Sequence, residues 1–202
     1  MDLNPNEDRT SKDLPCWERF QHGGRTRPLD LGNLFQNLLE VKNVFDKHKI
    51  IFWLSHGTVL GVRRDGNFIP WDDDADCSAY FSQRNDVDPA LDELKQRGFY
   101  IAPSVKGTPV SNDNAPWSDL HITRGGDKIE FWFFKKEGDF YIYDHLRQPP
   151  ELVHSAKYYD TLGTIKFRGV TFNCPNLLEE YLTMMYGPGW VTPDKNKKYN
   201  KS

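Results

Sequence analysis

Four aspartates lie close together in the first half of the chain: Asp72, Asp73, Asp74 and Asp76. They follow an apolar Ile-Pro-Trp run and lead into residues 75–81, which include Asp76 and whose composition is typical of a β-strand. Residues two apart on a strand share a face, so Asp74 and Asp76 can converge on one divalent cation, which would offset the repulsion between the carboxylates. Hard oxygen ligands favour Mg²⁺ or Mn²⁺. The cluster therefore predicts a metal site, with a solvated acidic loop as the alternative.

A calcium-binding loop is a second alternative, because Asp72, Asp74 and Asp76 have the opening spacing of an EF-hand. The sixth position of such a loop needs glycine for its sharp turn, and here it is Cys77. The twelfth position needs a bidentate glutamate, and here it is Gln83. These two positions exclude an EF-hand.

The pair Gly57-Thr58 follows a short apolar run, residues 50–54, and opens a predicted helix. The unpaired N–H groups and the positive end of a helix attract anions, and a glycine lets a phosphate approach the backbone closely. We therefore expect Gly57 and Thr58 to contact a phosphate. A phosphate site beside a metal site is the arrangement that phosphoryl transfer requires.

Glu130 lies inside an apolar run that reads as a strand. An unpaired acid there would cost several kcal/mol if it were buried, and a metal held by Asp74 and Asp76 would remove that cost. We predict that Glu130 is the third acid of the site. Asp127 and Asp119 are alternatives for that role, and a solvent-facing glutamate on an edge strand is the alternative to any role.

Composition limits the class of protein. The 26 basic and 29 acidic residues give a net charge of −3, so no overall basic field exists to hold nucleic acid. No uncharged stretch is long enough to span a membrane, and the polar N-terminus lacks the pattern of a secretory signal. We expect a soluble, cytoplasmic protein, with a Golgi or secretory location as the alternative if the chain is a fragment.

The length of 202 residues fits one domain. Residues 1–28 lack hydrophobic periodicity and predict a flexible arm, residues 29–193 a single domain, and residues 194–202 a frayed tail. The polar, Pro- and Asn-rich segment 106–117 predicts a loop that could close over a site.

Hydrophobic periodicity and turn residues predict an α+β fold, with a mixed, mostly antiparallel sheet flanked by helices. Asp30 is the expected N-cap of the first helix. The expected helices cover 30–49, 56–64, 88–97 and 176–185; the expected strands cover 50–54, 75–81, 119–123, 128–134, 140–143, and a hairpin of 161–167 with 170–173.

Three segments together resemble the LicD/fukutin family. The run GTVLGVRRDGNFIPWDDDAD at 57–76 is similar to the family's signature in its glycine turn, its arginine and its acidic cluster. KIEFWFFKKEGD at 128–139 resembles the strand that carries the family's third acid, and PNLLEEYLTMMYGPGWVTP at 175–193 resembles its closing helix. The resemblance covers roughly residues 34–193, which would make 29–193 a LicD-like catalytic domain.

The resemblance implies a nucleotidyltransferase-like fold and a transferase. Enzymes of the family transfer a phospho-alcohol, such as phosphocholine or ribitol phosphate, from a CDP-activated donor to a glycan hydroxyl. The metal ligands and catalytic residues it implies are Asp74, Asp76 and Glu130, and the substrate-binding residues are Gly57, Thr58, Arg64, Trp71, Asp72 and Asp73. Glu130 stands where the family usually has aspartate.

The resulting hypothesis is a transferase that depends on Mg²⁺ or Mn²⁺ and takes a nucleotide-diphosphate-linked donor and a glycan or small hydroxyl acceptor. Glu130 would hold a second metal or accept the proton of the acceptor hydroxyl. Trp71, Trp117 and Trp132 are candidates to stack on a base or sugar, and His56 and His121 are candidates to contact phosphate. The alternatives are a DxD-type glycosyltransferase and a catalytically inactive nucleotide-binding member of the fold.

Overall fold

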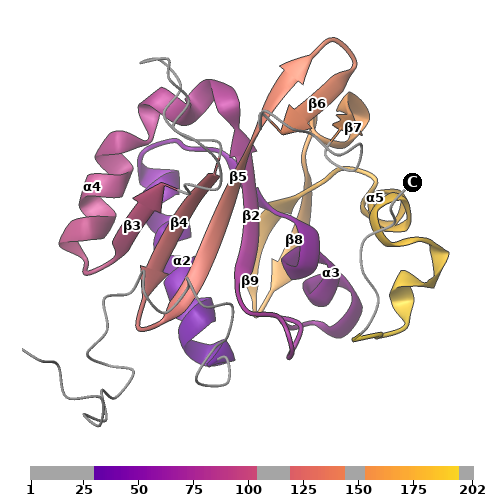
Figure 1. The fold of residues 1–202 in the computed structure, drawn as a ribbon, viewed down its shortest axis with the longest axis horizontal. Coiled ribbons are helices and arrows are strands. Elements are labelled where there is room, and N and C mark those ends of the chain that lie inside the picture. Colours follow the sequence, from indigo (N-terminus) through magenta and orange to yellow (C-terminus); the bar gives the residue numbers. More distant parts are fainter. Residues whose placement is uncertain (1–29, 104–118, 144–152, 196–202) are drawn as a thin grey trace, which may run out of the picture.

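The computed structural model describes residues 30–103, 119–143 and 153–195, and it has an α+β architecture (Figure 1). The helices are α2 (Leu31–Lys47), α3 (His56–Asp65), α4 (Asp88–Gln96) and α5 (Leu178–Tyr186), with short 3₁₀ helices η1 (Phe81–Asp86), η3 (Ala156–Tyr158) and η4 (Pro188–Val191). The strands are β1 (Phe52–Leu54), β2 (Ala75–Tyr80), β3 (Tyr100–Pro103), β4 (Asp119–Arg124), β5 (Asp127–Glu137), β6 (Phe140–Tyr143), β7 (Val153–Ser155), β8 (Gly163–Phe167) and β9 (Val170–Cys174).

The main sheet has seven strands, five of which lie in the order β1-β2-β5-β4-β3. β6 continues the sheet from the far end of β5, and β7 pairs with β6. β2 and β5 are parallel, with Asp76 beside Glu130, whereas the other pairs are antiparallel. Since β5 lies between β2 and β4, Glu130 is on a central strand, and the edge-strand alternative is wrong.

The apolar face of the sheet packs on α2, which crosses behind β4 and β5 in the view of Figure 1. Ile129 and Phe131 of β5 are fully buried on this face, and the Phe131 ring lies 5.1 Å from that of Phe45 of α2. The carboxylate of Asp30 accepts hydrogen bonds from the amides of Gly32 and Asn33, which confirms the expected N-cap. Burial of large apolar side chains here, each worth about 1.5–3 kcal/mol, holds the sheet in place.

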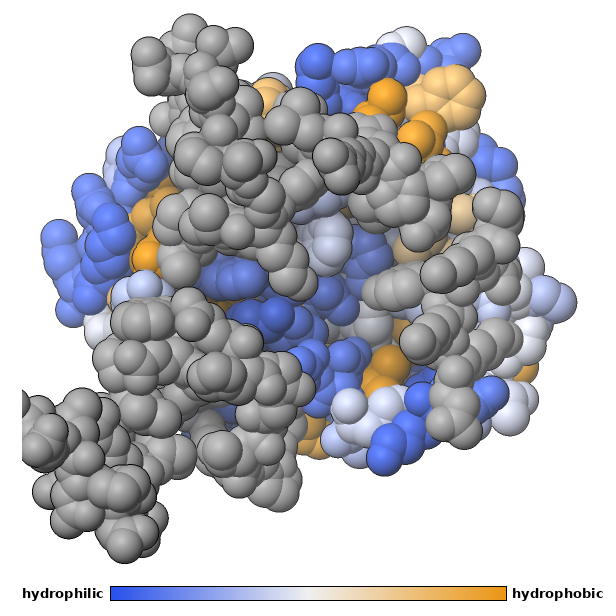
Figure 2. All heavy atoms as spheres, viewed as in Figure 1, coloured by the Kyte–Doolittle hydropathy of each residue, from blue (hydrophilic) through white to orange (hydrophobic). Residues whose placement is uncertain are grey.

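On the other side of the sheet, α3 lies against the start of β2 (Figure 1). It ends at Gly66, whose positive φ of 67° forms the left-handed cap that glycine adopts without strain. Arg63 near its C-terminus forms an ion pair with Glu179 of α5, at 2.5 Å. Figure 2 shows hydrophilic residues gathered at the centre of this face of the molecule.

A separate two-stranded sheet of β8 and β9 packs beside β1. Its turn is Arg168-Gly169, with positive φ at both residues, so the predicted hairpin is confirmed. The side-chain amide of Asn173 donates to the carbonyl of Phe52 at 2.9 Å and fastens the hairpin to the main sheet.

The structure adds features that the sequence pattern did not predict. β3 and β7 are short edge strands without clear alternation, and the parallel pairing of β2 with β5 joins segments far apart in the chain. The predicted arm at 1–28 and loop at 106–117 lie outside the described residues. Among the described residues, no helix combines the length and apolarity needed to cross a bilayer.

Candidate functional site

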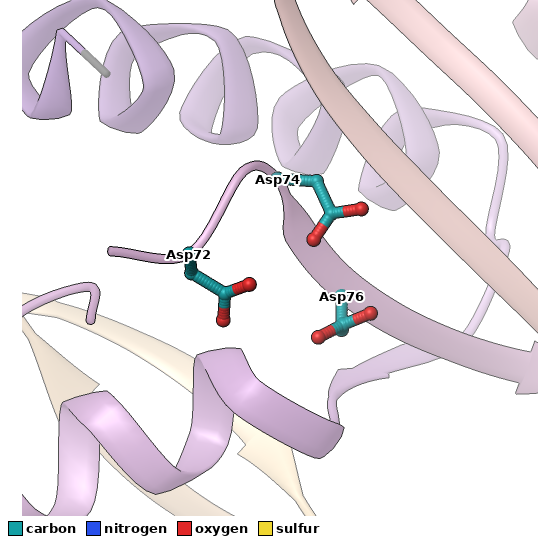
Figure 3. Close-up of side chains that lie close together, drawn as sticks. All are labelled: Asp72, Asp74 and Asp76. Atoms are coloured by element: carbon teal, nitrogen blue, oxygen red, sulfur yellow. The ribbon is translucent and has the colours of Figure 1, made fainter. Parts of the chain in front are cut away.

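The carboxylates of Asp72, Asp74 and Asp76 meet in one place. A ligand oxygen from each lies within 4.8 Å of the others, and all three side chains point into the space above α3 (Figure 3). Asp74 and Asp76 are 7% and 8% exposed, and Asp72 is half-buried on the loop before β2. The sequence assigned Asp72 to substrate binding, but the structure places its carboxylate with the two predicted metal ligands.

Gly57 allows the loop that carries Asp72 to lie close to the start of α3. A Cβ at this position would lie 2.3 Å from Oδ2 of Asp72, which is far inside contact distance, so a larger residue would displace the Asp72 carboxylate from its present position. The amide of Gly57 donates to Oδ2 of Asp76 at 3.1 Å, and the Thr58 hydroxyl accepts from the backbone amide of Asp76 at 2.7 Å. The start of α3 therefore positions Asp76, while phosphate contacts of Gly57 and Thr58 remain a prediction.

Burial and mutual repulsion disfavour the ionised forms of Asp74 and Asp76. Burial raises the pKa of Asp74 to about 7, against the opposing effect of Lys128. Burial, together with the charges of Asp74 and Asp72, raises the pKa of Asp76 well above its usual value. A cation placed among these oxygens would remove the repulsion that disfavours their ionised forms.

Glu130 has a different environment, because both of its oxygens have partners. Oε1 lies 2.9 Å from Nε2 of His121, which is directly opposite on β4, and Oε2 accepts from Nζ of Lys128 at 3.0 Å. Burial opposes ionisation of Glu130, but the His121 hydrogen bond and the Lys128 charge lower its pKa to about 2. Lys128 also reaches Oδ2 of Asp74, at 2.5 Å.

Sequence reasoning missed Lys128 and gave His121 a different partner. The signal for Lys128 was available, because it is two residues from Glu130 on one strand and therefore shares its face. His121 was a candidate for phosphate, yet the register of β4 and β5 brings it to Glu130. No sequence pattern gives that register directly.

The two alternatives to Glu130 occupy different backbone positions. Asp127 is buried and, by the alternation of side chains along β5, lies on the opposite face from Lys128 and Glu130. The backbone of Asp119 pairs with Trp132, two positions along β5 from Glu130. Of the three acids, Glu130 is the one whose strand neighbour is Asp76.

The remaining candidates for contacts with a base, a sugar or a phosphate are three tryptophans and His56. The Trp132 ring lies between the rings of His56, at 5.1 Å, and Tyr143, at 4.8 Å, and is tilted against both. His56 is buried, and burial lowers its pKa to about 3, so its ring is neutral. Trp71 is 43% exposed beside Asp72, and Trp117 falls outside the described residues.

Arg64 and Asp73, two further predicted substrate-binding residues, differ in their exposure: the Arg64 side chain is only 7% exposed, whereas Asp73 is exposed. The Arg64 guanidinium pairs with the adjacent Asp65, Nη2 to Oδ2, at 2.6 Å. Asp73 is exposed, and its amide donates to Oδ1 of Asp72 at 3.1 Å. Substrate contacts of both residues remain predictions.

The residues of the cluster fit a divalent cation. Asp74 and Asp76 each use Oδ2 for a protein contact and keep a second carboxylate oxygen. All the donors are hard oxygens, which Mg²⁺ and Mn²⁺ prefer. The missing side chain at position 57 leaves the third carboxylate close enough to complete the group.

Comparison with known families identifies the class of this domain. The profile described as "LicD/FKTN/FKRP, nucleotidyltransferase domain" matches residues 49–177, which contain the glycine turn, the acidic cluster and Glu130. The domain is thus of the nucleotidyltransferase type. The chain belongs to the LicD family, as the resemblance of its motifs indicated.

Several proteins are similar to this chain. The ribitol 5-phosphate transferase FKRP of Mus musculus is 24% identical over 185 residues, covering 89% of this chain and 36% of the relative. The Homo sapiens FKRP is 24% identical over 172 residues, covering 82% and 33%. An uncharacterised Rickettsia typhi protein is 24% identical over 156 residues, covering 74% and 45%. The chain thus spans about a third of the length of the two transferases.

Among solved structures, the lincosamide antibiotic adenylyltransferase LnuA is similar at 12% identity, with a TM-score of 0.46 over 70% of this chain and 79% of that chain. The solution structure of the antibiotic-resistance factor ANT(2'')-Ia is similar at 11% identity, with a TM-score of 0.45 over 73% and 66% of the two chains.

Proposed function

We propose that this protein is a metal-dependent transferase that moves a phospho-alcohol from a CDP-activated donor to a hydroxyl acceptor, such as a glycan. The observation that carries the proposal is the convergence of Asp72, Asp74 and Asp76 at the start of α3, inside the segment that matches the LicD family. The relatives named ribitol 5-phosphate transferase support ribitol phosphate, or a similar phospho-alcohol, as the transferred group.

The three aspartates would hold Mg²⁺ or Mn²⁺, which when bound would neutralise charge on the diphosphate of the donor. Gly57 and Thr58 orient Asp76 through the two hydrogen bonds described above. The exposed ring of Trp71 next to Asp72 is suited to contact the donor's base or sugar, and Arg64 and Asp73 complete the set of proposed substrate contacts.

In the proposed reaction, the acceptor oxygen attacks the phosphorus that carries the alcohol. The bond from that phosphorus to the bridging oxygen breaks, CMP leaves with the bonding electrons, and the acceptor loses its proton to a base. Glu130 is a weak base at neutral pH because its pKa is held at about 2. We therefore assign it a positioning role instead of proton transfer.

A donor screen tests the proposal. The purified chain is incubated with CDP-ribitol, CDP-choline or a UDP-sugar, a hydroxyl acceptor and Mn²⁺, and the released nucleotide is identified. Release of CMP coupled to acceptor modification is expected, and it should stop when EDTA is added. Release of UDP would instead indicate a glycosyltransferase. Tight CDP binding without metal, and no product with any donor, would indicate an inactive nucleotide-binding protein.

A further inference from the structure

The ammonium group of Lys128 lies between two carboxylates of the site. Its Nζ is 2.5 Å from Oδ2 of Asp74 and 3.0 Å from Oε2 of Glu130, and the side chain is only 15% exposed. Lys128 and Glu130 are held on the same face of a central strand, so this contact does not depend on a flexible loop. The lysine therefore occupies the position at which one cation could bridge Asp74 and Glu130.

Glu130 has little capacity left for a metal ion. Lys128 uses one of its oxygens and His121 uses the other, and both contacts come from strands with fixed register. A divalent ion bridging Asp74 and Glu130 would compete with the ammonium for the same oxygens, and the two positive charges would repel each other at this short distance. The Asp72, Asp74 and Asp76 group is different, because one oxygen from each of its three carboxylates lies within 4.8 Å of the others.

We propose that Lys128 takes the place of a second metal ion, so that the site binds a single divalent cation on Asp72, Asp74 and Asp76. This inference rests on the metal dependence in the proposed function. Lys128 is a positioning residue in this scheme: it places one positive charge between Asp74 and Glu130 and holds Oδ2 of Asp74 and Oε2 of Glu130. Glu130 then serves as the anchor of Lys128 and not as a metal ligand.

The number of Mn²⁺ ions bound per chain tests the inference, measured by isothermal titration calorimetry and by the free-Mn²⁺ signal in electron paramagnetic resonance. The full chain should bind one Mn²⁺. Lys128→Met removes the charge and keeps a similar length, so it should open a second site bridging Asp74 and Glu130, and the stoichiometry should rise to two. The double variant Lys128→Met, Glu130→Gln should return to one.

Two controls separate charge from packing. Lys128→Arg keeps the positive charge and should bind one Mn²⁺. Lys135→Met changes an exposed lysine of the same strand, which pairs with Glu137, and should also leave the stoichiometry at one. If Lys128→Met does not fold, as judged by circular dichroism, Glu130→Gln in the otherwise unchanged chain replaces it as the test, and it should bind one Mn²⁺ as the unchanged chain does.

The outcomes distinguish this inference from the proposed function. Two Mn²⁺ ions bound by the unchanged chain, or a single ion bound by a folded Lys128→Met variant, would overturn the role of Lys128 and leave metal-dependent transfer intact. If the unchanged chain binds no Mn²⁺ in the presence or absence of CDP, the metal dependence fails and the inference fails with it.

Discussion

Two groups of charged residues in this protein use similar side chains to opposite effect. On the surface formed by α2, α4 and β4, Glu93 accepts hydrogen bonds from Lys47 and Arg97 and lies 2.8 Å from His48. These partners lower the pKa of Glu93 to about 2. At the acidic cluster, burial raises the pKa of Asp74 to about 7 although Lys128 is in contact with it.

The difference between the two groups is in the balance of charge and in burial. The surface carboxylates have at least one basic partner each; Glu40, for example, pairs with Arg124 at 2.5 Å and Arg97 at 3.4 Å. The cluster brings three aspartates together beside the start of α3, and Lys128 contacts Asp74. In the surface network each glutamate is balanced by basic side chains, whereas in the cluster burial and repulsion between the carboxylates favour the binding of a cation.

Removal of a cluster carboxylate is the largest expected effect. Asp76→Asn keeps the size of the side chain and an oxygen for the Gly57 amide, but loses a charged ligand. Turnover should fall by about 10²–10³-fold or more, while the metal-free melting temperature stays similar or rises. The matched surface change Glu93→Gln should leave turnover unchanged. Equal losses of turnover in Asp76→Asn and Glu93→Gln would contradict the difference in role between the acidic cluster and the surface network.

A smaller effect, on Mn²⁺ affinity, is expected from Gly57→Ala. The new Cβ would meet Oδ2 of Asp72 at 2.3 Å and Oδ2 of Asp76 at 3.3 Å, so the Asp72 carboxylate must leave its present position beside the other two. Mn²⁺ affinity should fall by about 10–100-fold, as is typical when support of metal ligands is lost. Calorimetry measures this affinity, with Gly32→Ala in α2 as the control, where the new Cβ would lie 3.2 Å from Oδ1 of the N-cap Asp30, outside the acidic cluster. An unchanged Mn²⁺ affinity in Gly57→Ala would contradict the view that the close approach of the Asp72 carboxylate to Gly57 supports metal binding.

The pH dependence of stability should have opposite sign in the two groups. The pKa of Asp74 is raised above its value of 3.8 in the unfolded chain, so its favourable contribution is present below about pH 4 and is lost as the pH rises towards 7. In EDTA, the melting temperature should therefore fall over this window. Mn²⁺ should reverse the trend, because it competes with the proton and binds more tightly as the pH rises.

For Glu93 the pKa is lowered from 4.5 to about 2, so its contribution is present above pH 4.5 and is lost as the pH falls towards 2. Melting curves of the unchanged chain, Asp74→Asn and Glu93→Gln across pH 3–8 separate the two contributions. Asp74→Asn should reduce the slope of the metal-free curve between pH 4 and 7, and the remaining slope is expected from Asp76, whose pKa is also raised. An unchanged slope in this variant would contradict the contribution of Asp74.

The smallest effect is expected for the surface network itself. Glu93→Gln should lower the melting temperature slightly, because exposed ion pairs gain little against solvent screening and lost side-chain freedom. The decrease should shrink further in high salt. A large, salt-independent decrease, measured by differential scanning calorimetry, would show that this network is a main source of stability.

The sequence predicted the parts of the fold and the site that local patterns control. The Asp30 cap, the helix after Gly57 and the strand after the aspartates follow from caps, glycine turns and hydrophobic periodicity within short windows. The short motif around Gly57 and Asp76 also predicted that these residues act together, and the structure joins them by a hydrogen bond.

The parts that the sequence did not predict depend on contacts between distant segments. His121 reaches Glu130 only because β4 and β5 pair in one particular register, and Asp76 lies beside Glu130 only because β2 and β5 are parallel. Asp72 belongs to the cluster because the loop folds back over Gly57. Such pairings are settled by packing of the whole sheet, and no short window of sequence encodes them.

The alternation of β5 ties the integrity of the site to that of the core. Ile129 and Phe131 point to the side covered by α2, and Lys128 and Glu130 lie on the other side. A slip of one residue would exchange the two sets and drive an ammonium and a carboxylate into the apolar layer. The orientation of Lys128 and Glu130 toward the site is therefore retained or lost as a whole. It is retained for as long as the hydrophobic layer between the sheet and α2 stays assembled.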